Sequence, residues 1–234
     1  RILDRKFGLR KLEALGLARS EYNKLTAMLA SPSGLLLVTG PTGSGKTTTL
    51  YACLQQVNTG TRKINTIEDP IEYALAGIRQ SQVHARLGVD FPELLKNILR
   101  QAPDVIMVGE IRDPETAQIA IQSALTGPLV FTTVHANNVV DVLGRFLNMG
   151  VEPYQFVSAL NCVMAQRLVR LICSHCKRPT LVAAKALQAA GLSPELAHTH
   201  PFSAGTGCGV CGGAGAHVRD ALLVRPPLCE SDRG

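Results

Sequence analysis

The sequence predicts an α/β fold with a mostly parallel sheet in three layers, followed by a small cysteine-bearing subdomain. Short apolar runs alternate with helix-like runs, which is typical of strands and helices that succeed one another in such a fold. A glycine-rich turn from Gly40 to Thr48 joins one apolar run to the helix-like run after it. Two Cys-x-x-Cys pairs near the end of the chain indicate the separate subdomain.

Length and composition are those of a globular protein with a sizeable core. The chain has 234 residues, of which 46% are apolar and 18% charged. No uninterrupted apolar run approaches the roughly 18 residues of a membrane span. The net charge of +6 fits a solvated surface, an acidic partner or acidic lipid equally well. Because Trp is absent and aromatic residues are few, we expect no sequence-specific nucleic acid partner.

Residues 1–33 are expected to be a lead-in that leans on the core. Leucines at helix-like spacing, among them Leu12 and Leu15, precede the break at Ser31-Pro32-Ser33. The sequence begins at Arg1 without methionine, in the middle of a pattern, so we expect a further domain before it.

The core is expected to span residues 34–171. Its glycine-bounded first strand is almost wholly apolar, as in a buried parallel strand, and the later apolar runs repeat this pattern. Asp113 and Pro114 are typical of the start of a helix that Gly127 ends. The expected strands are 34–39, 63–67, 80–84, 105–110 and 129–135, and the expected helices are 46–56, 92–101, 114–126, 141–149 and 153–171.

The glycine-rich turn has the spacing Gly-x-x-x-x-Gly-Lys-Thr, which indicates a phosphate-binding loop. Its glycines allow successive backbone N–H groups to point inward at a polyphosphate such as that of ATP. The Lys46 ammonium would reach the outer phosphates and the Thr47 hydroxyl would reach Mg²⁺. The expected nucleotide-binding residues are Gly40, Pro41, Thr42, Gly43, Ser44, Gly45, Lys46, Thr47 and Thr48.

Candidate catalytic residues follow the expected strands. Glu68, with Asp69 and Glu72, comes after one strand, and Glu110 ends another in the Walker B manner; the carboxyl ends of parallel strands face the ligand. Ordinary solvated acids are the alternative. His135 ends a further strand, where it would sense the γ-phosphate or serve as an ordinary structural histidine. Arg112 is a candidate second cation beside Lys46.

Two cysteine pairs predict a structural zinc site in residues 172–234. Each pair can chelate through a tight turn, and four sulfurs complete a closed tetrahedral site with no open position for catalysis. Free thiols are the alternative. A short helix is expected at 183–190. The expected ligands are Cys173, Cys176, Cys208 and Cys211, whereas Cys53, Cys162 and Cys229 are interpreted as buried small hydrophobes or incidental thiols.

Together these motifs resemble the ATPases of the type II secretion and type IV pilus assembly family, the GspE/PulE/PilB group. The resemblance extends from about Gly8 to Cys211. Its motifs are the phosphate-binding loop, Thr66–Tyr73 as the aspartate box, Pro103–Asp113 as the Walker B region, Thr126-Gly127 with Thr133–Asn137 as the histidine box, Ala165–Arg170, and the four cysteines.

This resemblance implies a RecA-like ATPase core that works as a homo-hexamer and hydrolyses ATP with Mg²⁺. It implies a motor for pilus or pseudopilus assembly that acts through platform and docking proteins, in the cytoplasm and peripheral to the bacterial inner membrane. By position, Glu68 would be the water-activating glutamate, Glu110 the Walker B acid, and His135 a residue near the γ-phosphate. Family members complete the site with arginines from the preceding domain.

The sequence departs from the family pattern at several positions. Ala102 replaces the usual Asp, Pro128 a His, and Ala136 a Thr, while 215–219 and the tail from Arg225 diverge. Pro128 removes an imidazole and a backbone N–H from the histidine box. Two alternatives therefore stay open, a degenerate nucleotide-binding assembly subunit and a DNA-uptake or DNA-transfer ATPase of the same superfamily.

Overall fold

The computed structural model describes residues 9–136 and 139–225. The chain divides into two compact units, Arg1–Leu168 with Leu222–Gly234, and Val169–Ala221. We describe each unit by itself. The expectations that concern Arg1, Gly8, Asn137, Cys229 and the tail beyond Arg225 lie outside the described residues.

A seven-stranded sheet in the order β3-β2-β4-β5-β1-β6-β9 organises the first unit. Strand β1 pairs in parallel with β5 and β6, β2 with β3 and β4, and β4 with β5. The mostly parallel α/β sheet predicted from the sequence is therefore confirmed. The strands are β1 Gly34–Thr39, β2 Ile64–Glu68, β3 Arg79–Gln82, β4 Val105–Val108, β5 Leu129–Val134, β6 Leu160–Ile172 and β9 Ala216–Arg225.

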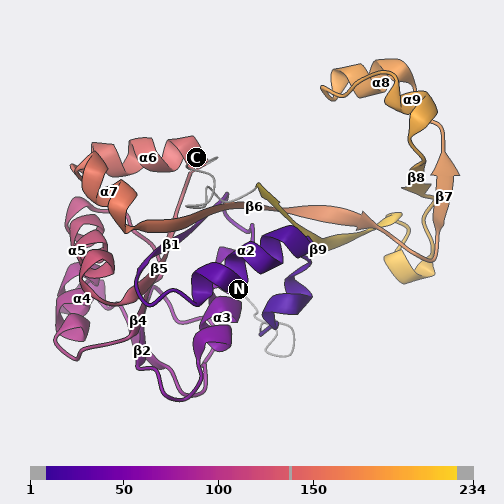
Figure 1. Cartoon of the computed structure of the whole chain (residues 1–234). Coiled ribbons are helices and arrows are strands. Elements are labelled where there is room, and N and C mark those ends of the chain that lie inside the picture. The colour runs from indigo at the N-terminus through magenta and orange to yellow at the C-terminus, as the bar shows by residue number, and fades with distance from the viewer. Residues whose placement is uncertain (1–8, 137–138, 226–234) are drawn as a thin grey trace. The chain divides into compact units, whose positions relative to one another are not determined.

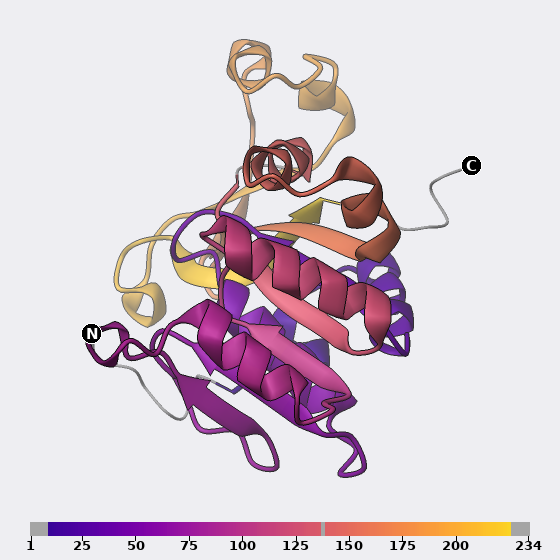
Figure 2. The same cartoon turned by 90° about the vertical axis from the view of Figure 1, so that its left-hand side faces the viewer.

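Helices cover both faces of the sheet because successive strand residues point to opposite sides. Leu36 and Val38 of β1 belong to one core cluster, which also contains residues of α2 and α3. Leu35 and Leu37 belong to the other, with residues of α4, α5, α6 and α7. Figures 1 and 2 show the α4 and α5 layer on one side of the strands and α3 on the other. These are the three layers that the sequence predicts.

The helices begin and end largely where the sequence predicts. Asp113 caps α5 by accepting hydrogen bonds from the Thr116 backbone N–H at 2.8 Å and hydroxyl at 2.6 Å. Pro114 occupies the first turn and Gly127 the C-cap position. The helices of this unit are η1 Leu12–Leu15, α2 Arg19–Leu29, α3 Lys46–Val57, η2 Ala85–Leu87, α4 Phe91–Leu99, α5 Pro114–Thr126, α6 Val139–Asn148 and α7 Pro153–Ala159.

The predicted helix 153–171 is wrong beyond its first two turns. Helix α7 ends at Ala159, and the chain continues as strand β6 beside β1. Cys162 and Met164 point into one core and Val163 into the other. A strand that is buried on both faces is a continuous apolar run, so its periodicity does not separate it from a buried helix.

The second unit contains a two-stranded antiparallel sheet and short helices. β7 Lys177–Thr180 pairs with β8 Phe202–Gly205, and the helices are α8 Ala184–Ala189, α9 Leu196–Thr199 and η3 Gly209–Cys211. Helix α8 confirms the short helix expected at 183–190. Among the described residues of the whole chain, no helix has the length and apolar character to cross a membrane.

Candidate functional site

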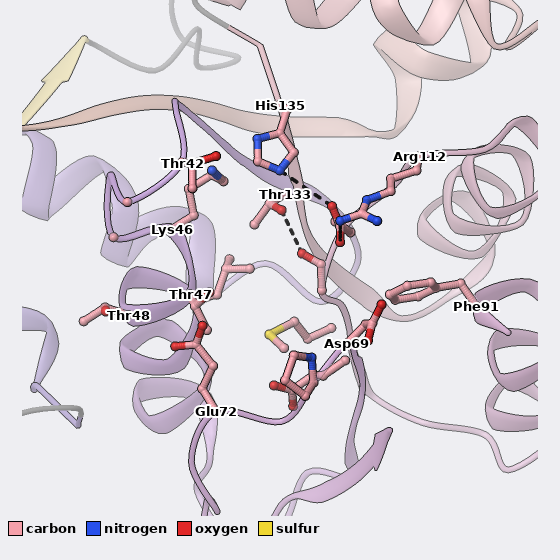
Figure 3. Close-up of a pocket in the computed structure, with 18 residues that line it drawn as sticks. Thr42, Lys46, Thr47, Thr48, Asp69, Glu72, Phe91, Arg112, Thr133 and His135 are labelled. Carbon is pink, nitrogen blue, oxygen red and sulfur yellow. Dashed lines mark hydrogen bonds and ion pairs between the residues drawn. The ribbon is translucent and has the colours of Figure 1, made fainter. Parts of the chain in front are cut away.

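A cavity of about 290 Å³ opens at the carboxyl ends of β1, β2, β4 and β5. Figure 3 shows Lys46 and Thr47 on one wall and Arg112, Thr133 and His135 on others. The structure brings the predicted site residues of all four strand ends to this cavity: Lys46, Thr47, Glu68, Glu110, Arg112 and His135 line it. Among the loop residues, Thr42, Gly43, Gly45 and Thr48 also line it, whereas Gly40, Pro41 and Ser44 do not.

The phosphate-binding loop is shaped by glycines and by strand β6 beneath it. Gly43 and Gly45 have φ of 77° and 86°, in the left-handed region that favours glycine. A Cβ on Gly40 would lie 2.4 Å from the backbone oxygen of Gln166, so only glycine fits there. The buried Gln166 side chain donates from Nε2 to the Ser44 carbonyl at 2.6 Å. The loop is therefore held from below while its outer edge faces the cavity.

Lys46 lies at the first position of α3 and folds over the loop. Its Nζ donates to the carbonyl oxygens of Gly40 at 2.9 Å and Pro41 at 3.1 Å. Burial lowers the pKa of Lys46, the Glu110 charge opposes this, and Arg167 adds to it. A partly desolvated ammonium gains more from an anionic partner than a hydrated one does, so this position favours a phosphate.

Glu68 is buried at the end of β2 and is held by three hydrogen-bond donors. Oε1 accepts from the Thr66 hydroxyl at 2.5 Å and from Gln80 Nε2 at 3.0 Å, and Oε2 accepts from the Tyr51 hydroxyl. Burial first, and then the bond to Glu68, raises the pKa of Tyr51, so its hydroxyl keeps its proton as a donor. Asp69 and Glu72, which follow Glu68, also line the cavity.

Glu110 follows β4 and contacts two other predicted site residues. Arg112 Nη2 lies 2.5 Å from Glu110 Oε1, and His135 Nε2 lies 3.7 Å from Oε2. Burial lowers the pKa of His135, and Lys46 and Arg112 lower it further against the opposing effect of Glu110. Neutral imidazole is therefore the favoured form of His135 at neutral pH.

Threonine and arginine side chains hold the strand ends around the cavity. The Thr133 hydroxyl donates to the Gly109 carbonyl at 2.7 Å, which ties β5 to the Walker B turn. Thr39 Oγ1 contacts the carbonyl of Ala136 at 2.8 Å and accepts from its N–H at 3.1 Å. Arg145 on α6 donates to the His135 carbonyl at 2.7 Å.

Sequence reasoning assigned no role at this site to Tyr51, Gln80, Gln166 or Thr133, although Gln166 and Thr133 lie within two of the quoted motifs. Tyr51 and Gln166 are fully buried, but α3 and β6 carry several other polar residues, so the local pattern did not single these two out. The roles of Gln80 and Thr133 depend on which strands become neighbours, which no local pattern shows.

Pro128 lies away from the cavity that contains His135. It precedes Leu129 at the start of β5, whereas His135 follows the end of that six-residue strand, about 20 Å further on. Pro128 instead lines a different hollow with Ala102 and Asp104. Within one chain, the proline therefore leaves the surroundings of His135 intact.

The four cysteines of the second unit converge, with all four sulfurs within 4.8 Å of one another. The Sγ atoms of Cys173 and Cys208 are 3.9 Å apart, those of Cys176 and Cys211 3.8 Å, and those of Cys208 and Cys211 3.7 Å. Four sulfurs about 2.3 Å from a tetrahedral zinc would be separated by about 3.8 Å, so the cluster fits this metal.

Backbone amides also point at this sulfur cluster. The N–H groups of Cys208 and Gly215 donate to the Cys211 sulfur at 3.2 and 3.3 Å. Although burial opposes them, these bonds lower the pKa of Cys211 to about 6, which favours the thiolate that a metal requires. Gly205 and Gly215 pass so closely that a Cβ on Gly205 would lie 1.7 Å from the Gly215 carbonyl oxygen.

The other described cysteines lie outside this cluster. Cys53 and Cys162 are buried in the first unit and form no disulfide bond with a described residue. Burial raises the pKa of Cys53 to about 12, so it stays protonated and unreactive.

Comparison with known protein families shows to which family this chain, with its cavity and its four-cysteine cluster, belongs. The family described as "Type II/IV secretion system protein" matches residues 1–224. The chain belongs to this family. The α/β core predicted from the motifs is thus supported by family membership as well as by the sheet.

Relatives of this chain include proteins named for two kinds of apparatus. The chain is 46% identical over 222 residues to "Type II secretion system protein E" of Dickeya dadantii, which covers 95% of this chain and 44% of that protein. It is 42% identical over 222 residues to "Type IV pilus assembly ATPase PilB" of Thermus thermophilus, which covers 95% of this chain and 25% of that protein. The chain thus spans less than half the length of either relative.

A solved structure agrees with the fold of the core. The pilus retraction motor PilT with bound ADP superimposes with a TM-score of 0.63 at 36% identity, over 71% of this chain and 50% of that one. ADP is the ligand bound to PilT in that structure.

Proposed function

We propose that this chain is the ATP-hydrolysing part of a motor subunit that drives pilus or pseudopilus assembly in a type II secretion or type IV pilus system. The observation that carries the proposal is the single cavity into which the phosphate-binding loop, Glu68, Glu110 and His135 all open. Family membership and relatives named as secretion and pilus ATPases support it.

The loop and the start of α3 would hold the nucleotide. Backbone N–H groups at the N-terminus of a helix favour phosphate, and Lys46 adds the positive charge that the outer phosphates require. Thr47 and Glu110 would hold Mg²⁺, which neutralises phosphate charge when bound. The fit rests on the glycine-only backbone at Gly40 and on the hydroxyl and carboxylate groups that share the cavity.

Glu68 would orient the water that attacks the γ-phosphate, because this residue lines the cavity and its carboxylate is fixed by neighbouring donors. The neutral imidazole of His135 would donate a hydrogen bond near the γ-phosphate, and Arg112 would add charge stabilisation after release from Glu110. Phosphoryl transfer is catalysed mainly by such positioning and electrostatic stabilisation.

The remaining assignments belong to the same proposal. The protein would act as a homo-hexamer, in the cytoplasm at the bacterial inner membrane, through platform and docking proteins. Cys173, Cys176, Cys208 and Cys211 would hold a structural zinc, supported by their tetrahedral spacing. The domains would be 1–33, 34–171 and 172–234, with the first as the lead-in from a preceding domain.

Substitution of Lys46 tests the activity. In the full-length protein, Lys46→Ala should abolish steady-state ATP turnover and weaken binding of a fluorescent ATP analogue, because the outer phosphates lose their cation. Lys24→Ala on α2 serves as the control for loss of a lysine outside the cavity. Normal turnover by Lys46→Ala would contradict the mechanism, and tight ATP binding without hydrolysis by the unsubstituted hexamer would favour a degenerate subunit instead.

A further inference from the structure

We propose that Tyr51 is a positioning residue for ATP hydrolysis, which acts by fixing the Glu68 carboxylate so that one acceptor site remains for water. The inference rests on the proposed function, in which Glu68 orients the attacking water. Four observations carry it: the burial of the pair, the donors around the carboxylate, the cavity that Glu68 lines, and the helix that carries Tyr51.

Tyr51 and Glu68 form a buried contact between helix α3 and strand β2. The exposed fractions of Tyr51 and Glu68 are 1% and 2%, and the tyrosine hydroxyl donates to Glu68 Oε2. The same hydroxyl accepts a hydrogen bond from the Glu72 backbone N–H at 3.3 Å. The ring of Tyr73 packs edge-on against that of Tyr51, with centroids 6.5 Å apart and planes at 76°. The hydroxyl is therefore fixed in position by two hydrogen bonds, one to the Glu68 carboxylate and one from the Glu72 N–H.

The hydrogen-bond donors around the Glu68 carboxylate leave one acceptor site unoccupied among the described residues. A carboxylate offers about four lone-pair sites. Thr66 and Gln80 fill the two sites of Oε1, and Tyr51 fills one site of Oε2. Among the hydrogen bonds of the described residues, Oε2 thus keeps one acceptor site, and Glu68 lines the cavity. Because Tyr51 occupies the other site of that oxygen, it sets the direction in which a water can bind.

The helix that carries Tyr51 also carries the phosphate-binding residues. Lys46 and Thr47 form the first turn of α3, and Tyr51 lies five positions after Lys46, about 7.5 Å along the axis. One rigid element therefore places both the phosphate contacts and the hydroxyl that orients Glu68. Misplacement of a reacting group by about 1 Å can cost a factor of about 100 in rate, so the phenol is expected to affect turnover more than binding.

A structural role for Tyr51 is separable from this positioning role. The ring fills the core beneath α3, and Tyr51→Phe keeps the ring while it removes only the hydroxyl. A purely structural tyrosine would therefore tolerate phenylalanine without a change in kcat. A positioning tyrosine would lose kcat while the affinity for nucleotide persists, because Lys46 and the loop are unaffected.

The test measures ATP turnover by the full-length protein. Tyr51→Phe should lower kcat by roughly 10- to 100-fold, while KM and the affinity for a fluorescent ATP analogue stay within about twofold. Tyr22→Phe is the matched control, since it removes an exposed hydroxyl that donates to Glu13 at 3.1 Å, and it should leave kcat unchanged. Unchanged kcat in Tyr51→Phe would overturn the proposal.

A double-substitution cycle shows whether Tyr51 acts through Glu68. Tyr51→Phe combined with Glu68→Gln should turn over ATP at the same rate as Glu68→Gln alone. If Tyr51→Phe lowers the rate of Glu68→Gln by the same factor as that of the unsubstituted protein, Tyr51 acts independently and the proposal fails. Normal turnover by Glu68→Gln would instead contradict the role proposed for Glu68, so the two failures are distinguishable.

A second donor keeps the test decisive if the Tyr51→Phe protein is less stable. Gln80→Leu, on β3, removes the donor to Glu68 Oε1 together with the hydrogen bonds of Gln80 to the Tyr73 carbonyl and the Leu75 N–H. It should also lower kcat with little change in KM, because the carboxylate regains freedom to rotate. Normal kcat in a folded Gln80→Leu protein, checked by its melting temperature, would count against positioning by these donors.

Discussion

Ala102 has backbone strain that a single substitution should relieve. Its φ is 47°, a left-handed conformation that in the described chain is otherwise confined to glycines. An alanine Cβ costs about 1–2 kcal/mol in this conformation. The position follows α4, where the Ala102 N–H donates to the Leu99 carbonyl at 3.2 Å. The strain therefore lies in the turn that leads into β4, and Ala102 does not line the cavity that contains Lys46 and Glu68.

We expect Ala102→Gly to raise the free energy of unfolding by roughly 0.5–1 kcal/mol, because relief of strain exceeds the added freedom of the unfolded chain. Urea denaturation measures the change. Ala27→Gly, at an exposed position within α2, is the control and should lower the same quantity by about 1 kcal/mol. Equal losses at both positions would contradict the strain at Ala102.

His135 should make stability depend on pH in a defined direction. Its folded pKa is lowered by burial and by Lys46, so the unfolded state binds a proton more readily. Its contribution is therefore complete above the unfolded pKa of about 6.5 and is lost as pH falls below that value.

Unfolding free energies at about pH 7.5 and 5.5 test this, since the two values bracket the unfolded pKa of histidine. His135→Gln should lose less stability on acidification than the unsubstituted protein. Substitution of the exposed His198 on α9 by Gln is the control for loss of a histidine outside the cavity. A steeper loss in His135→Gln would reverse the sign of the predicted shift.

At the scale of elements, the sulfur cluster should determine whether the second unit is folded. Structural zinc supplies folding free energy, and the unit of Val169–Ala221 has a two-stranded sheet and short helices around its four cysteines. Cys208→Ser should therefore lose bound zinc, and the backbone amides of this unit should lose their protection against hydrogen exchange. The amides of α3 should keep theirs. Elemental analysis and hydrogen exchange of the full chain measure both.

Ser174→Ala is the matched control for this experiment, because it alters an exposed neighbour of Cys173 without removing a sulfur. It should keep both zinc and protection. Full protection of residues 173–215 in the Cys208→Ser protein without metal would contradict metal-dependent folding.

An element could be predicted when the residues that determine it lie close together in the sequence. The turn at Gly40–Thr48 and the cap at Asp113 follow from chemistry within a few residues, and both were predicted. Strand β6 was not, because its identity depends on the open edge of β1, to which it is distant in sequence. The cavity could be predicted in part because parallel strands place Glu68, Glu110 and His135 at one edge. The hydrogen bonds that Tyr51 and Gln80 donate to Glu68 could not be predicted, because they depend on tertiary packing.

At the scale of the whole molecule, the lysine and the arginine that line the cavity in the described part of the chain both already have partners. Lys46 donates to loop carbonyls, and Arg112 lies beside Glu110. The spreading charge of phosphoryl transfer requires further cations, and arginines supplied in trans raise such rates by about 10³–10⁵. In the proposed hexamer, a neighbouring subunit would supply them.

We therefore expect ATP turnover per chain to rise by roughly tenfold or more as full-length subunits assemble into rings, because trans arginines act only there. Turnover measured across a concentration series, alongside mass photometry of the same samples, tests this. Lys46→Ala rings provide the background rate. Equal turnover per chain in monomers and rings would contradict a shared site.

The close approach of the Gly205 and Gly215 backbones limits which substitutions are tolerated at these two positions. At either position even alanine would collide with the opposite backbone, so every missense variant should be eliminated under selection for function. Gly209, between the second pair of cysteines, has open space around it and should drift freely. Saturation mutagenesis with a growth readout would therefore find sharply different tolerance within one glycine-rich segment. The segment therefore contains positions with no permitted alternative beside positions with many.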